Sequence, residues 1–176
     1  MRPSELLPLV ALAFLAVTTP APAADKAPTA ASSPDLIVAN APVRIARIQV
    51  KPDVSFDDAV ESLKLRANQR NLKYVGVNQL GKEITAESGL PSRRIEIFSF
   101  CDALTAQKMI AADASMVAYM PCRIGMLEDA DGKVWVIAML IDETVLRALP
   151  SPARESAERV TAALQEIMVA AAHGDL

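Results

Sequence analysis

The chain has 176 residues, a formal net charge of −3 and a charged fraction of 22%, and its basic residues are scattered along the sequence. With an aromatic content of only 4%, this pattern argues against nucleic-acid binding, which needs a basic patch and stacking side chains, and against binding at a membrane surface. A single histidine, and a sequence without a glycine-rich phosphate loop or a G-x-S-x-G motif, argue against a catalytic triad or a nucleotide site.

Residues 1–24 have the three parts of a secretory signal peptide. Arg2 supplies the basic start, residues 6–17 form the apolar segment, and Ala23 and Ala24 offer the small residues of a cleavage site. The apolar segment is about a dozen residues long, whereas a membrane span needs roughly 20. We therefore expect export to the bacterial periplasm, with no stable membrane anchor after the signal peptide is removed.

The composition changes after the signal peptide. Residues 25–40 are rich in alanine, proline and serine and poor in large apolar groups, which predicts a flexible tether. An α+β domain is predicted over residues 41–141, and residues 142–176 are predicted to form a C-terminal helical extension. The length of the part that follows the tether suits one domain with one core.

Apolar periodicity predicts the first elements of this domain. Residues 43–50 and 72–80 are expected to be strands, separated by a helix that begins after Ser55 and has an amphipathic apolar stripe. Residues 82–90 predict a loop with a helical turn that ends at a glycine and a proline. Residues 93–101 alternate in polarity and predict a third strand.

The second half of the domain is expected to contain a short helix, a hairpin and a final helix. Asp102 can cap the short helix, and Gly132 can close the turn between the hairpin arms YMPCRIGMLE and KVWVIAMLI. The second arm is apolar without interruption, which predicts burial on both faces. The last helix is predicted to begin at Ser151 and to end at Gly174.

The predicted order is strand, helix, strand, strand, helix, strand, strand, with an added C-terminal helix. This order indicates an α+β fold in which helices pack on an antiparallel or mixed sheet.

Residues 93–140, RRIEIFSFCDALTAQKMIAADASMVAYMPCRIGMLEDADGKVWVIAML, resemble the central signature of the family called domain of unknown function 302. The block MPCRIGMLEDADGKVWV is the most specific part of the likeness, and the resemblance covers residues 41–141 approximately. It implies an α+β domain that is often exported, has no agreed catalytic activity and offers no catalytic residues to transfer. Residues 113–117, DASMV, depart from the small turn residues usual in the family, so the loop before the hairpin is expected to differ.

The chain has two cysteines, Cys101 and Cys122, and in an exported protein such a pair is expected to form a disulfide. If the strands that carry them are antiparallel neighbours, both side chains could project from one face at bonding distance. The bond would stabilise the fold by about 3 kcal/mol through the restricted entropy of the unfolded chain. A structural disulfide is therefore the first prediction for this pair.

Two other uses of the sulfur atoms stay open. Thiolate and thioether sulfurs select Cu(I), so Cys101, Cys122, Met120 and Met126 are candidate copper ligands, although methionines in strands are usually core filler. A redox couple or reactive thiol would need a basic neighbour to stabilise the thiolate, and Lys108 on the intervening helix is the candidate. Two buried, unpaired thiols are the remaining alternative.

Two charged motifs have ordinary alternatives. Arg94 and Arg123 could form an anion-binding patch on the sheet, with simple surface solvation as the competing interpretation. The segment Asp129-x-Asp131-Gly132 is similar to part of a calcium loop, but the position that requires a bidentate glutamate holds Leu140, so a hairpin turn is expected.

These observations predict a non-enzymatic binding or accessory module with a Cys101–Cys122 disulfide and no cofactor. Its partner is expected to be a small molecule or a periplasmic protein, and a homo-oligomer is compatible with the sequence. The first alternative is a thiol-dependent redox or sulfur-transfer enzyme that uses the same cysteine pair. The second is a copper-binding accessory protein that uses cysteine and methionine sulfurs.

Overall fold

The computed structural model describes residues 42–175. The predicted signal peptide (1–24) and tether (25–40) lie outside these residues. The described elements are β1 (Val43–Gln49), α1 (Phe56–Gln69), β2 (Lys73–Asn78), α2 (Leu80–Ser88), β3 (Ile95–Cys101), α3 (Ala103–Ala112), the 3-10 helix η1 (Ala114–Tyr119), β4 (Cys122–Glu128), β5 (Val134–Ile141), α4 (Glu143–Ala148) and α5 (Ser151–His173).

The strands form a five-stranded sheet in the order β1-β5-β4-β3-β2, and every neighbouring pair is antiparallel. The predicted α+β class is confirmed, and of the two sheet types expected from the sequence the antiparallel one is correct. β4 and β5 are joined by the predicted tight turn, in which Gly132 has a φ of 76° and the carboxylate of Asp129 accepts from the indole N–H of Trp135 at 2.8 Å. This bond holds the pKa of Asp129 below its ordinary value.

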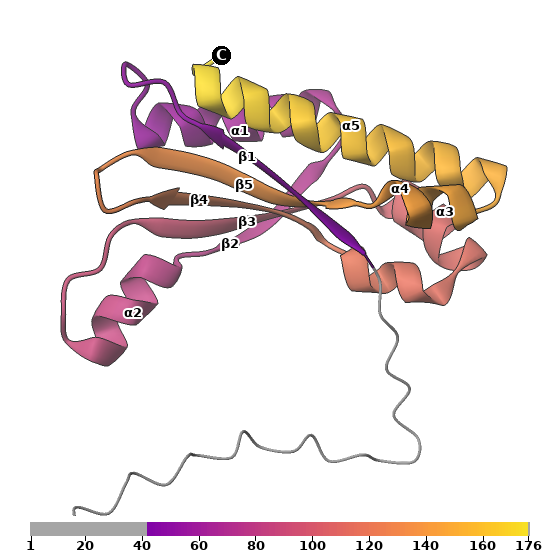
Figure 1. The fold of residues 1–176 in the computed structure, drawn as a ribbon, viewed down its shortest axis with the longest axis horizontal. Helices are drawn as coiled ribbons and strands as arrows, with labels where there is room; N and C mark the ends of the chain where they lie inside the picture. The colour runs from indigo at the N-terminus through magenta and orange to yellow at the C-terminus, as the bar shows by residue number, and fades with distance from the viewer. Residues whose placement is uncertain (1–41, 176) are drawn as a thin grey trace, which may run out of the picture. The chain divides into compact units, whose positions relative to one another are not determined.

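Helices α1 and α5 lie side by side on one face of the sheet (Figure 1). Strand side chains alternate between the two faces, so every second residue of each strand points at these helices. The core between the layers is formed by large apolar side chains that are almost fully buried, among them Leu63, Phe98, Phe100, Ile124, Met126, Val136 and Ile167. Because α5 supplies part of this core, the residues predicted as a C-terminal extension pack with the sheet as one unit.

A second, smaller apolar cluster lies at one end of the sheet. It joins Met109 of α3 and Met116 of η1 to Ile141, Leu146 and further residues of α4 and α5. Tyr119 packs against its edge. This cluster fixes the segment that leads into β4.

The predicted helix boundaries are set by caps that the structure contains. The hydroxyl of Ser55 accepts from the backbone N–H of Asp58 at 3.1 Å, as the capping motif predicts. The carboxylate of Asp102 accepts from the backbone N–H of Leu104 at 3.1 Å at the start of α3. None of the helices within residues 42–175 is both long and apolar enough to cross a membrane.

Residues 82–90 differ from the prediction, because most of them belong to the nine-residue helix α2. The helix ends at Gly89 in the left-handed conformation (φ 69°). Gly81 is buried where the helix meets the chain before β3, and a β-carbon there would lie 2.9 Å from the backbone nitrogen of Ile95. The glycine that lowers the helical propensity of this segment is therefore what lets the helix pack closely.

The other face of the sheet is called the open face, because neither α1 nor α5 covers it (Figure 1). By strand alternation and register it comprises Val43, Ile45, Arg47, Gln49, Lys73, Gly76, Asn78, Ile95, Ile97, Ser99, Cys101, Arg123, Gly125, Leu127, Trp135, Ile137, Met139 and Ile141. Many of these are apolar, and Ile45 and Met139 are 64% and 36% exposed. The expectation that β5 is buried on both faces is therefore wrong for the open face.

Candidate functional site

Strands β4 and β5 separate at one end of the sheet. β4 pairs with β3 from its first residue, through Phe100 and Cys122, but its pairing with β5 begins only at Ile124 and Ala138. On its other side β5 stays paired with β1 as far as Ile141. The first two residues of β4 therefore face a gap in the sheet, which we call the β4–β5 split.

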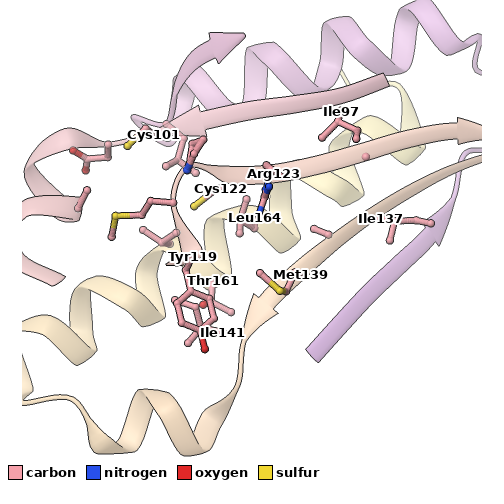
Figure 2. Close-up of a pocket in the computed structure, with 18 of the residues that line it drawn as sticks. Ile97, Cys101, Tyr119, Cys122, Arg123, Ile137, Met139, Ile141, Thr161 and Leu164 are labelled. Carbon is pink, nitrogen blue, oxygen red and sulfur yellow. The ribbon is translucent and has the colours of Figure 1, made fainter. Parts of the chain in front are cut away.

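A cavity of about 450 Å³ lies at this split and opens onto the open face. Tyr119 to Arg123 line one side, Met139 and Ile141 of β5 line another, and Thr161 and Leu164 of α5 lie beneath (Figure 2). Ile97, Gly125 and Ile137 extend the lining along the open face, and Cys101 and Met109 add to it from β3 and α3. The volume falls in the range of roughly 300–1,000 Å³ that is usual for small-molecule sites.

Most polar groups in the lining are already satisfied within the fold. The hydroxyl of Thr161 donates to the carbonyl of Ala157 at 2.9 Å, and that of Thr105 donates to Asp102 at 2.6 Å. The Thr105 bond is the main reason that the pKa of Asp102 lies below its ordinary value, so this carboxylate stays ionised and bonded. The cavity therefore offers a mainly apolar surface.

The predicted disulfide between Cys101 and Cys122 is not present, and both cysteines are free. Their strands are antiparallel neighbours, as the prediction required, but Cys122 stands opposite Phe100. The register therefore offsets the two cysteines by one residue, and alternation puts Cys101 on the open face and Cys122 on the helix-covered face. Sequence spacing alone could not show this offset.

Neither thiol has the properties of an activated nucleophile. Burial raises the pKa of Cys122 to about 11, and the nearby Cys101 adds to the shift. Burial also raises the pKa of Cys101, with a further contribution from the charge of Asp102. Lys108, the predicted basic partner, is not among the causes of either shift, so both thiols stay protonated at neutral pH.

The four candidate copper ligands all contribute to the lining of the cavity, but they come from different parts of it. Met126 is fully buried in the core, and it lies four positions along β4 from Cys122, about 13 Å at the usual rise per residue. Met120 packs in the cluster at the end of the sheet, and Cys101 is on the open face. Within residues 42–175 no three His, Cys, Asp and Glu side chains are grouped closely enough to hold a metal ion.

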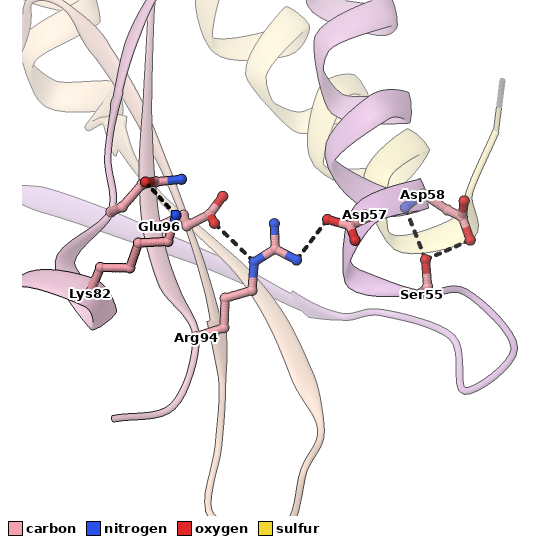
Figure 3. A network of polar contacts seen from close by, with 7 residues as sticks. Ser55, Asp57, Asp58, Lys82, Arg94 and Glu96 are labelled. Carbon is pink, nitrogen blue, oxygen red and sulfur yellow. Dashed lines mark hydrogen bonds and ion pairs between the residues drawn. The ribbon is translucent and has the colours of Figure 1, made fainter. Parts of the chain in front are cut away.

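Arg94 and Arg123 also point to opposite faces, so the structure does not join them in one anion-binding patch. The guanidinium of Arg94 donates to Glu96 at 2.9 Å and to Asp57 at 2.7 Å (Figure 3). It also lies 3.9 Å from the ring centre of Phe56. Burial lowers the pKa of Arg94, but these two carboxylates outweigh it and raise the pKa above its ordinary value. The side chain of Arg94 is therefore engaged in contacts that stabilise the fold and is not available to bind an anion.

Arg123 is different, because it is exposed and lines the cavity (Figure 2). It forms no side-chain hydrogen bond or ion pair with any residue between 42 and 175, whereas six other ion pairs exist there. Tyr119, half-buried at the cavity, likewise makes no side-chain hydrogen bond within this range. Apart from the two thiols, Arg123 and Tyr119 are the polar side chains of the described lining that remain available.

Sequence reasoning found Cys101, Cys122, Met120, Met126 and Arg123 in the lining but missed most of the cavity. The missed residues include Tyr119, Gly125, Ile137, Met139, Thr161 and Leu164. The available signal was the set of apolar residues on both faces of β1 and β5, of which one face has no helix to cover it. The split itself depends on strand pairing and could not be read from the sequence.

The fold and the cavity define a small α+β domain with a helix-covered sheet and an apolar site on the uncovered side. The model of the family named domain of unknown function DUF302 matches residues 48–171, so the chain belongs to this family. The match extends beyond the predicted boundary at 141 and includes most of α5.

The fold is also similar to a crystal structure of an uncharacterized conserved DUF302 protein from Bacillus stearothermophilus. The TM-score is 0.60 at 14% sequence identity, with 72% of this chain and 96% of that chain covered. At this identity the likeness concerns the fold alone. No curated protein is a recognisable relative of the chain.

Proposed function

We propose that this protein is a non-enzymatic binding module whose β4–β5 split holds a small apolar molecule. The observation that carries the proposal is the cavity of about 450 Å³ at the split, lined mainly by aliphatic, methionine and cysteine side chains. Burial of an apolar ligand there would remove apolar surface of both partners from water, which is the main driving force for such binding.

The chemistry of the lining supports binding over catalysis. The thiols have raised pKa values, and the carboxylate of Asp102 is occupied by Thr105 and the start of α3. A general base or nucleophile would need a group that can lose or accept a proton near neutral pH. The cavity residues instead combine shape and apolarity, which select a ligand by fit.

Two glycines on the open face allow a matched test. Gly125 lines the cavity between Ile97 and Ile137, and the nearest atom to an added β-carbon would lie at an ordinary 3.7 Å. Gly76 is on the same face in edge strand β2, and an added β-carbon meets nothing within 4 Å. Valine fits a strand at both positions, but only at Gly125 does it fill the cavity.

The experiment measures binding of N-phenylnaphthylamine, a neutral apolar dye that fluoresces out of water. We expect saturable binding to the wild-type chain, an affinity about tenfold lower for Gly125→Val, which corresponds to about 1.4 kcal/mol, and wild-type binding for Gly76→Val. Dye that does not bind the wild type, or that binds Gly125→Val unchanged, would contradict the proposal.

We further propose that the module works after export, because residues 1–24 have the pattern of a signal peptide. The intact mass of the protein purified from its natural host tests this. A mature chain that begins after Ala23 or Ala24 supports export, and a chain that retains residues 1–24 contradicts it.

A further inference from the structure

The strand residues of the open face carry positive charge without negative charge. Its strand residues, all within 42–175, include Arg47, Lys73 and Arg123 and no aspartate or glutamate. The whole chain has a net charge of −3, so this face is opposite in sign to the molecule as a whole. A surface of this kind raises the local concentration of anions.

The three cations differ in what they contact. The guanidinium of Arg47 lies 5.4 Å from the ring centre of Trp135. Lys73 is on edge strand β2 and is paired with Cys101 of β3. Arg123 lines the cavity. It is therefore the cation placed to meet the polar end of a bound molecule.

The negative charge nearest to the cavity is already engaged. Asp102 lines the cavity, but its Oδ2 accepts from the hydroxyl of Thr105 at 2.6 Å and its Oδ1 accepts from the backbone N–H of Leu104 at 3.1 Å. Asp102 thus serves as the cap of α3. No ion pair joins it to Arg123 among the described residues.

We propose that the ligand of the cavity is a small amphipathic monoanion, such as an alkyl or aryl carboxylate. This inference rests on the proposed binding function and adds the class of ligand. The apolar tail lies in the β4–β5 split against Met139, Ile141 and Leu164. The carboxylate meets Arg123, whose planar guanidinium can donate two parallel hydrogen bonds to it.

The test compares two competitors that differ in their polar end, decanoate and the neutral decanol. Each displaces the bound neutral dye from the wild-type chain, from Arg123→Gln and from Lys73→Gln. Lys73→Gln is the matched control, because this substitution removes one positive charge from the same face and Lys73 does not line the cavity.

We expect wild-type protein to bind decanoate about tenfold more tightly than decanol, the effect of one charge-assisted hydrogen-bonded pair. Arg123→Gln should lower the affinity for decanoate about tenfold more than it lowers the affinity for decanol. Lys73→Gln should bind both competitors as the wild type does.

Equal binding of decanoate and decanol to the wild type, or an unchanged decanoate affinity in Arg123→Gln, would overturn the anionic ligand. The dye would still bind in that case, so the proposed binding function would stand. If the protein forms a dimer at higher concentration and dye binding falls as it does so, a second copy of the chain covers the open face. That result would also overturn the inference.

Discussion

The two faces of the sheet are built from the same strands but have different surroundings. On the covered face, Phe98, Phe100 and Ile124 are at most 1% exposed beneath α1 and α5. On the open face, Ile45 and Met139 remain exposed beside a cavity. The covered face accounts for stability, and the open face has apolar surface that stability does not explain.

This contrast also divides pairs of identical residues. Of the two cysteines, one is on each face, and of the two arginines considered for an anion patch, Arg94 is held in the fold while Arg123 lines the cavity. Each pair can therefore be used to test whether the faces differ as described.

The largest difference is expected for two isoleucines on neighbouring strands. Ile124 is fully buried on the covered face, and Ile137 is half-buried on the open face. Ile124→Ala should lower the free energy of unfolding by about 2–5 kcal/mol. Ile137→Ala should lower it by about 1 kcal/mol, because much of the Ile137 side chain stays in contact with water in the folded protein. Urea unfolding measures both, and equal losses would show that the open face is buried.

The next difference concerns the cysteines. Because the pKa of Cys122 is raised to about 11, its thiolate is scarce at pH 8, and we expect iodoacetamide to modify it at least about tenfold more slowly than a cysteine in the unfolded chain. Cys101 should react with iodoacetamide faster than Cys122, because Cys101 lies on the open face of the sheet. Peptide mass spectrometry measures both rates, and faster modification of Cys122 would contradict the register.

The raised pKa of Cys122 also predicts a dependence of stability on pH. The folded pKa lies above the ordinary value of 9.0, so the folded protein holds the thiol proton more tightly than the unfolded chain. The stabilising effect of the protonated Cys122 thiol is complete below pH 9 and is lost as the pH rises through about 11. Cys122→Val should flatten the fall in unfolding free energy over this window, and an unchanged slope would argue against the burial.

The arginines should show a smaller effect. Arg94→Gln removes the ion-pair partner of Glu96, whose side chain is only 8% exposed, and should lower the free energy of unfolding by about 1–2 kcal/mol. The loss is limited because the Arg94 side chain is itself partly exposed to water. Arg123→Gln should change stability by less than about 0.5 kcal/mol. Thermal unfolding of both variants measures this, and a comparable loss for Arg123 would mean that it belongs to the fold.

The sequence predicted the fold well where one local signal sufficed. Ser55 and Asp102 cap their helices, Gly132 closes the hairpin, and the strand order in the chain is as expected. Helix α2 was missed because Gly81 lowers the helical propensity of its segment, whereas packing on β3 requires it.

The site was predicted poorly because it depends on contacts between distant segments. One residue of offset between β3 and β4 separates Cys101 from Cys122, and the position at which β4 leaves β5 decides where the cavity lies. Neither follows from periodicity, because a strand keeps its alternation whatever its register with a neighbour.

The central claim is that the β4–β5 split binds a small apolar ligand, and amide chemical shifts measured during titration with N-phenylnaphthylamine test it most directly. The account predicts that the largest shift changes fall on residues 119–125 and 137–141, that distant amides in α1 change little, and that Gly125→Val needs about tenfold more dye to reach the same fraction of the changes. Changes that concentrate on α1 or on edge strand β2, or that follow the same titration curve in Gly125→Val as in the wild type, would contradict it.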